Sequence, residues 1–152
     1  MTMADVMVKI KVPLPPNDPS GGEAEWMWAD SDGENLFIVR NVPVFAFGLS
    51  YGDAVNTTMI DGVPVFANIA RHNGHSTYRI YTKTDRHSPE VTALLERLKA
   101  LGCDIEVATD KVIAVDVLPK ADVYLVYSAL QDAEQKNIIE FEEGYCGHPL
   151  RK

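Results

Sequence analysis

The clearest pattern of secondary structure in the chain runs from Ser76 to Glu143: STYRIYTKTDRHSPEVTALLERLKALGCDIEVATDKVIAVDVLPKADVYLVYSALQDAEQKNIIEFEE. It contains a β-type run, a helical stripe, two β-type runs around an Asp-Lys turn, a second helical stripe and a last β-type run. We therefore expect the order strand, helix, strand, strand, helix, strand, with helices over 89–101 and 121–137.

The first of these helices also carries its own end signals. Ser88 is a typical N-cap residue, Pro89 suits the first helical position, and Gly102 ends the apolar stripe. This order of elements is typical of ferredoxin-like folds, in which two helices cover one face of a four-stranded antiparallel sheet. The side chains that we expect to be buried between helices and sheet are Leu94, Leu98, Val126 and Leu130.

The first half of the chain is rich in short β-type runs and has no helical period. Residues 6–14 alternate apolar and polar side chains, and Asp61-Gly62 joins two further runs as a hairpin. A small β-barrel or a bent β-sheet is the expected result. The chain is thus predicted to be an α+β protein, with a β-rich subdomain at 1–75 and a ferredoxin-like subdomain at 76–152. The two could also form one continuous domain.

Composition and charge disfavour several classes of protein. The 152 residues carry a formal net charge of −8, and their Lys and Arg side chains are scattered, which disfavours direct binding of nucleic acid. Such a surface attracts a basic protein partner. The apolar runs are far shorter than the roughly 20 residues that span a bilayer, and no secretory signal is visible, so no membrane contact and a cytoplasmic location are expected.

Cys103 and Cys146 stand far apart, and structural thiols are expected, with a disulfide or reactive pair as the alternative.

The densest polar segment spans residues 71–79 and reads RHNGHSTYR. Its two histidines lack a third ligand at a suitable spacing, so neither a metal site nor another cofactor is predicted. His75, Thr77 and Arg79, together with Asp53, form a possible ligand site, and a hydrolase that uses His75 is a further alternative. The simpler interpretation is architectural: we expect His75 to be buried, with a ring nitrogen bonded to the backbone or to Asp53.

Two segments combine acidic with aromatic side chains and are candidate partner-binding surfaces. Trp26 and Trp28 share one face of a predicted strand, which is typical of core residues, although an exposed pair would suit an interface. Glu140, Glu142 and Glu143 crowd the last strand. These glutamates are expected to form either a solvated face or the acidic half of a protein interface.

Four short sequence motifs follow one another along the chain: Glu25-x-x-Trp28-Ala29, Asn41-Val42-Pro43-x-Phe45, Gly52-Asp53-x-Val55 and Gly74-His75-Ser76-Thr77-x-Arg79. Together they resemble the bacterial family known as domain of unknown function 4265, over roughly Val6 to Leu101. Val44 departs from the pattern, because an aromatic residue is expected after the proline. The resemblance implies a shared fold and a shared polar set, and it implies no reaction. Small acidic proteins of such families are often immunity proteins encoded beside toxins.

Three functions follow as hypotheses. The leading one is a non-enzymatic immunity or antitoxin-type inhibitor, whose acidic surface neutralises a cationic toxin by direct binding. The second is a small-ligand-binding regulatory domain with its site near His75 and Arg79. The third is an enzyme that uses His75 as acid or base, with Arg79 holding an anion.

Overall fold

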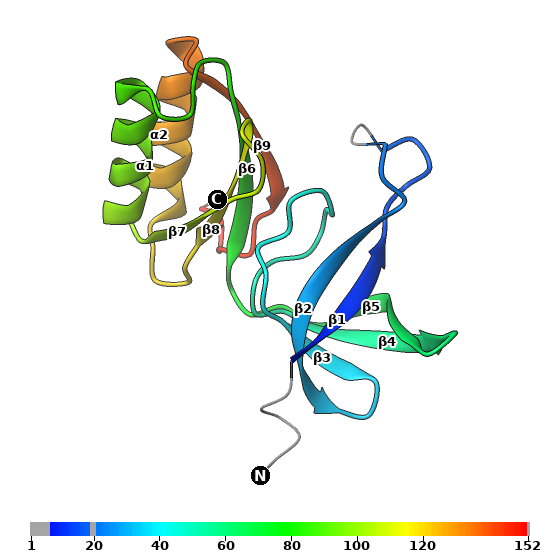
Figure 1. The fold of residues 1–152 in the computed structure, drawn as a ribbon. Helices are drawn as coiled ribbons and strands as arrows, with labels where there is room; N and C mark the ends of the chain where they lie inside the picture. The colour runs from blue at the N-terminus through cyan, green and yellow to red at the C-terminus, as the bar shows by residue number, and fades with distance from the viewer. Residues whose placement is uncertain (1–6, 19–20, 152) are drawn as a thin grey trace.

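The computed structural model describes residues 7–18 and 21–151, and it arranges them as two β-sheets with two helices (Figure 1). The elements are β1 (Met7–Pro13), β2 (Ala24–Gly33), β3 (Leu36–Val39), β4 (Ala54–Ile60), β5 (Val63–Arg71), β6 (Ser76–Thr82), α1 (Pro89–Ala100), β7 (Cys103–Val107), β8 (Val112–Val117), α2 (Val123–Gln135) and β9 (Ile139–Tyr145). The protein is therefore a mixed α+β structure in which strands predominate, as the sequence predicts.

The first five strands form a closed ring. Each strand pairs with the next in antiparallel fashion, and β5 returns to β1 through a parallel pairing of Lys11 with Val65. Alternate side chains of these strands point into the ring and fill it. The buried residues of this core include Ile10, Val12, Met27, Ala29, Phe37, Val39 and Val55.

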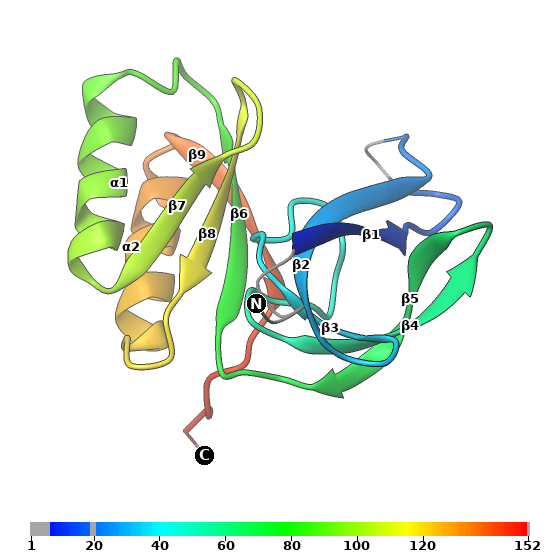
Figure 2. The same cartoon turned by 60° about the horizontal axis from the view of Figure 1, so that its bottom comes forward.

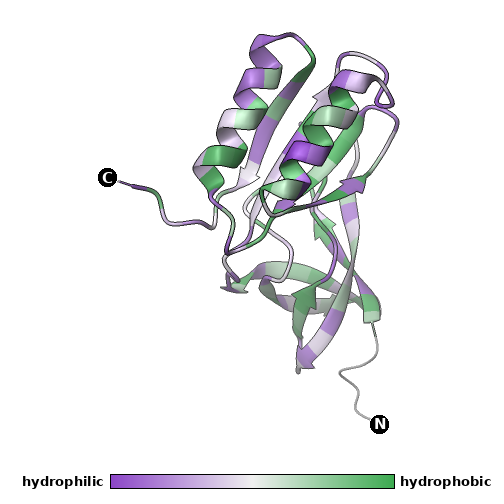
Figure 3. Cartoon of the chain, turned by 90° about the vertical axis from the view of Figure 1, so that its left-hand side faces the viewer, coloured by the Kyte–Doolittle hydropathy of each residue, from purple (hydrophilic) through white to green (hydrophobic). Residues whose placement is uncertain are grey.

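The remaining four strands form a separate antiparallel sheet in the order β7-β8-β6-β9. Helices α1 and α2 both pack on one face of it, with the ring beyond the opposite face (Figure 2). The buried residues of both helices are apolar, among them Val91 of α1 and Ala129 of α2, and hydrophobic bands alternate with hydrophilic ones along each helix (Figure 3). All four residues expected to be buried in this layer, Leu94, Leu98, Val126 and Leu130, are at most 7% exposed.

The helix ends follow from local capping. The Ser88 hydroxyl accepts the amide of Val91 at 3.4 Å, so α1 begins at the proline as predicted. The Asp122 carboxylate accepts the amide of Tyr124 at 2.9 Å. This cap starts α2 at Val123, two residues later than the sequence pattern suggests. Within the described residues, no helix is both long and apolar enough to cross a membrane.

Strand β6 has two different faces because successive side chains of a strand point to opposite sides. Tyr78 and Ile80 belong to the core beneath the helices. Thr77 and Arg79 point the other way and bond to the long connection between β3 and β4. This connection, residues 40–53, is here called the joint loop. It lies between the ring and the sheet (Figures 1 and 2).

Candidate functional site

The joint loop is held from the ring side by Glu25. Its carboxylate accepts the backbone amides of Val44 at 2.7 Å and of Phe45 and Ala46 at 2.9 Å each. Three amide donors on one carboxylate fix the loop firmly, since bonds to an ionised acceptor are stronger than neutral ones. The loop therefore leaves the ring in a defined direction.

Arg79 holds the same loop from the sheet side. Its guanidinium is fully buried and donates to the carbonyl of Ala46 at 2.9 Å, to the carbonyl of Phe45 at 3.2 Å and to Glu142 at 3.2 Å. Its Cζ also lies 4.5 Å from the centre of the Phe47 ring. These contacts use all three nitrogens of the guanidinium, so Arg79 joins the two parts of the chain in this arrangement.

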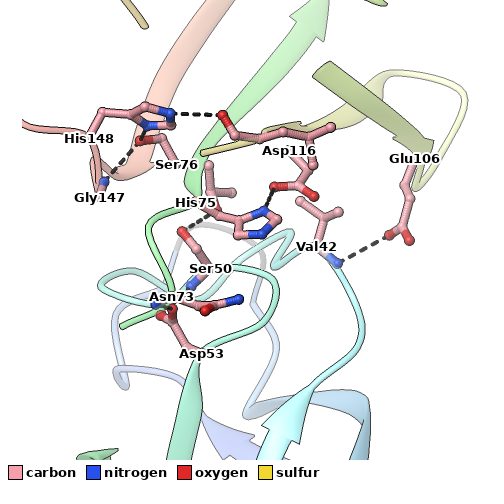
Figure 4. Close-up of polar contacts among 12 residues, drawn as sticks. Val42, Ser50, Asp53, Asn73, His75, Ser76, Glu106, Asp116, Gly147 and His148 are labelled. Carbon is pink, nitrogen blue, oxygen red and sulfur yellow. Dashed lines mark hydrogen bonds and ion pairs between the residues drawn. The ribbon is translucent and has the colours of Figure 1, made fainter. Parts of the chain in front are cut away.

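His75 is buried, at 7% exposure, as the architectural interpretation expects. Its partner differs from the expectation: Nδ1 bonds to Asp116 at 2.7 Å, on the neighbouring strand β8 (Figure 4). Asp53 instead bonds to His72 and to the amides of Ser50 and Asn73, each at 2.9 Å. Asp53 thus closes the end of the joint loop, and Asp116 is the partner that sequence reasoning missed.

The C-terminal tail adds a second buried histidine that sequence reasoning did not single out. The ring of His148 bonds to the Ser76 hydroxyl at 2.6 Å and to the carbonyl of Leu118 at 2.9 Å. The amide of Gly147 donates to the same hydroxyl at 2.9 Å. Ser76 is fully buried, so this serine–histidine pair anchors the tail and offers no open nucleophile.

The hydroxyls of Thr77 and Ser50 lie 2.7 Å apart, and both residues are fully buried. All four residues of the possible ligand site are therefore buried and bonded within the chain: Asp53, His75, Thr77 and Arg79. Among the described residues, no group of three or more His, Cys, Asp or Glu side chains could hold a metal ion.

An open pocket of about 440 Å³ lies beside the joint loop, on the face of the sheet away from the helices. It combines three aromatic rings with three carboxylates. Its lining residues are Asp18, Phe45, Phe47, Tyr81, Val112, Glu140 and Glu142. We call it the acidic pocket.

The three predicted partner-binding glutamates do not lie together. Glu140 and Glu142 line the acidic pocket, opposite Tyr81 and Arg79 of β6. Glu143 pairs with Tyr78 on the helix side of the sheet and accepts its hydroxyl at 2.8 Å. Strand alternation therefore splits the set, and only two of the three can belong to one surface.

The carboxylates of the pocket differ in how firmly they are held. Glu142 accepts both Arg79 Nε and the Tyr81 hydroxyl on Oε1, and 38% of its side chain is exposed. Burial, and then the hydrogen bond to Glu142, raises the pKa of Tyr81 to about 12, so that its hydroxyl remains a donor at neutral pH. Glu140 is 66% exposed and lies 3.5 Å from Lys83, an ion pair of little strength at the surface.

Trp26 and Trp28 lie outside the ring, at 49% and 43% exposure, so their interpretation as core residues is wrong. The intervening Met27 of β2 points inward and is fully buried. Lys11 and Lys9 of β1 lie directly opposite the two tryptophans, with their ammonium groups 6.0 and 5.2 Å from the ring centres. This aromatic surface is locally basic, in contrast to the acidic pocket.

Four residues of the pattern that resembles the family hold the joint loop in place. They are Glu25, Asp53, Thr77 and Arg79. The family model described as "Domain of unknown function (DUF4265)" matches residues 25–141. The chain belongs to this family. A search of curated proteins gives no match.

A solved structure described as "Novel crystal structure of a hypothetical protein from Neisseria gonorrhoeae" is similar to this chain, with a TM-score of 0.79 and 20% identity. The match covers 95% of this chain and 98% of the other. At this identity the likeness concerns the fold alone.

Proposed function

We propose that this protein is a non-enzymatic binding protein that captures a cationic protein partner, as an immunity or antitoxin-type inhibitor of a toxin does. The observation that carries the proposal is the acidic pocket, where Glu140 and Glu142 stand beside Phe45, Phe47 and Tyr81. Opposite charge steers a partner to a surface, while aromatic side chains that become buried supply much of the affinity.

The state of the other polar residues supports binding over hydrolysis. His75 has its Nδ1 on Asp116, Ser76 bonds to His148, and Arg79 is occupied by two carbonyls and a carboxylate. A catalytic acid, base or anion holder must reach its substrate, and these buried groups do not face the open pocket.

The tryptophan surface fits a cationic partner less well. Lys9 and Lys11 stand over Trp28 and Trp26, and a basic partner would meet these ammonium groups first. We therefore assign the cationic partner to the acidic pocket and leave the tryptophans outside the contact.

We also propose a finer description of the architecture. The strand order β7-β8-β6-β9 with both helices on one face supports a ferredoxin-like second half. The separate cores of the ring and of the sheet support a division at 1–75 and 76–152. A cytoplasmic location remains part of the same proposal.

A second candidate is a small-ligand-binding regulatory domain, and the pocket volume favours it specifically. Ligand pockets commonly measure roughly 300–1,000 Å³, and the acidic pocket falls within that range. Its occupant would be a small cation rather than an anion near His75 and Arg79.

Capture on matched resins tests the proposed function. Wild-type protein, Glu140→Lys and Glu96→Lys are immobilised and exposed to extract of the source organism and to the purified product of any adjacent toxin-like gene. Glu96 is a suitable control because its side chain is 70% exposed and lies 4.0 Å from Lys99, much as Glu140 lies near Lys83.

We expect a basic protein on the wild-type and Glu96→Lys resins, released by salt and lost from the Glu140→Lys resin. A partner that is acidic, or one retained equally by all three resins, would overturn the proposal. Glu142 and Glu143 are avoided because each bonds to a buried side chain of β6, so reversing them would disturb folding.

A further inference from the structure

The acidic pocket places flat aromatic surface beside carboxylate oxygens. Phe47 is 59% exposed although its ring also contacts the guanidinium of Arg79. Glu142 and Glu140 occupy neighbouring positions on the same face of β9. The pocket therefore offers two kinds of contact to one entering group: a ring face and an anionic acceptor.

One cation of the chain, the guanidinium of Arg79, already contacts residues that line the acidic pocket. The Cζ of Arg79 lies 4.5 Å from the centre of the Phe47 ring, and its Nε donates to Glu142 at 3.2 Å. A buried guanidinium thus already uses one ring and one carboxylate of the pocket lining. The lining thus contains the two kinds of group, a ring face and a carboxylate, that a planar, multiply donating cation can contact together.

We propose that the acidic pocket receives an arginine side chain of the protein partner. This inference rests on the proposed function and names the chemical group that the site recognises. The incoming guanidinium stacks on Phe47 or Tyr81 and donates to Glu140, whose present pair with Lys83 is exposed and easily exchanged.

Arginine and lysine carry the same charge, so net charge does not distinguish between them. Arg79 and Lys83 offset part of the negative charge of the pocket carboxylates. Discrimination must therefore come from stacking and from directed hydrogen bonds. A guanidinium is planar, is weakly hydrated and donates in a fork, whereas an ammonium is compact and strongly hydrated.

The test uses two capped peptides, acetyl-Gly-Arg-Gly-amide and acetyl-Gly-Lys-Gly-amide, titrated into ¹⁵N-labelled full-length protein. Amide chemical shifts locate the binding site and give the Kd. We expect the arginine peptide to bind about five-fold more tightly than the lysine peptide. Its shifts should cluster at residues 45–47 and 140–142.

Three variants make the test specific. Phe47→Ala and Glu140→Gln should each weaken the arginine peptide about two- to five-fold, since one removes the ring and the other the exposed carboxylate. Glu96→Gln, which removes an equally exposed carboxylate from α1, should leave the Kd unchanged. The spectra of the free variants show directly whether each remains folded.

Equal affinity for both peptides, shifts spread over the helices, or no binding of the arginine peptide would overturn the arginine inference. These outcomes are separate from failure of the proposed function. If the basic partner still needs Glu140 while the peptides bind equally, the proposed function stands and the arginine inference falls. If the arginine peptide binds as expected but the partner is acidic, the proposed function falls and the recognition of a guanidinium stands.

Discussion

Replacing Gly144 with alanine tests whether Arg79 of β6 holds the joint loop against the sheet. A Cβ at this position of β9 would overlap Nη1 of Arg79 and lie 3.1 Å from its Cζ. The backbone of Gly144 is outside the left-handed region, so the cost comes from the collision and not from φ. To make room, the guanidinium must leave the carbonyls of Phe45 and Ala46, or β9 must shift.

The magnitude follows from these contacts. Overpacking costs about 1–3 kcal/mol, and each lost hydrogen bond from a charged donor costs about 1.5–3 kcal/mol. Partial relaxation avoids some of this, so we expect about 3 kcal/mol of lost stability in total. For a chain of this length that corresponds to a fall of roughly 6–12 °C in Tm.

Urea unfolding followed by far-UV circular dichroism measures this cost. Tryptophan fluorescence is a poor probe here because Trp26 and Trp28, which are the only two tryptophans, are already half exposed. The matched control is the same substitution in an Arg79→Lys background, which keeps the charge but lacks Nη1. If Gly144→Ala lowers the free energy of unfolding by less than about 1 kcal/mol, or by the same amount in both backgrounds, Arg79 does not hold the joint loop as described.

Three further predictions concern the core and the tail. Leu98→Ala should cost about 2–5 kcal/mol in urea unfolding because Leu98 is fully buried in the helix–sheet core; a cost below about 1 kcal/mol would contradict that packing. His148→Ala should cost about 1–3 kcal/mol and speed proteolysis of the tail, since it removes the bonds from the ring to the Ser76 hydroxyl and to the carbonyl of Leu118; unchanged proteolysis would argue against the anchor. Burial, and then the negative charges of Asp116 and Asp104, raises the pKa of the Cys103 thiol to about 12, so a disulfide reagent at mildly alkaline pH should label Cys103 only after unfolding; labelling in the native state would show that the thiol is accessible.

Much of the second half of the fold could be predicted because its signals are local. Ser88, Pro89 and Gly102 mark the ends of α1 within a few residues of the helix itself. The apolar stripe fixes which face of the helix is buried, and Leu98 follows from it. Such signals need no knowledge of distant contacts.

The tryptophans show where periodicity stops being informative. Alternation places Trp26 and Trp28 on one face of β2, but it does not say which face points into the ring. The core of the five-stranded ring takes the smaller Met27 and Ala29 from β2, and the two larger side chains lie outside it. The face of β2 that points into the ring is therefore the one with the smaller side chains, and the polarity pattern alone does not identify it.

The partner of His75 depends on the register in which β6 and β8 pair, and the sequence does not reveal this register. His75 lies 41 residues from Asp116, and the two meet only because β6 pairs with β8 in the observed register. The acidic pocket is even less predictable, since it requires Phe47 of the joint loop to approach Glu140 of β9. The glutamates were visible as a cluster, yet alternation along β9 separates Glu143 from the other two.

In the proposed function, Glu140 and its neighbours steer a cationic partner into the acidic pocket. The most direct measurement is the association rate of the captured partner with wild-type protein, Glu140→Lys and Glu96→Lys, recorded over a range of salt concentrations. Charges more than about 8 Å apart are screened at physiological ionic strength, so steering should weaken as salt rises. We predict a wild-type rate that falls steeply with salt, a similar curve for Glu96→Lys, and a slower and flatter curve for Glu140→Lys. A wild-type rate that is independent of salt, or the same curve for all three proteins, would contradict the claim.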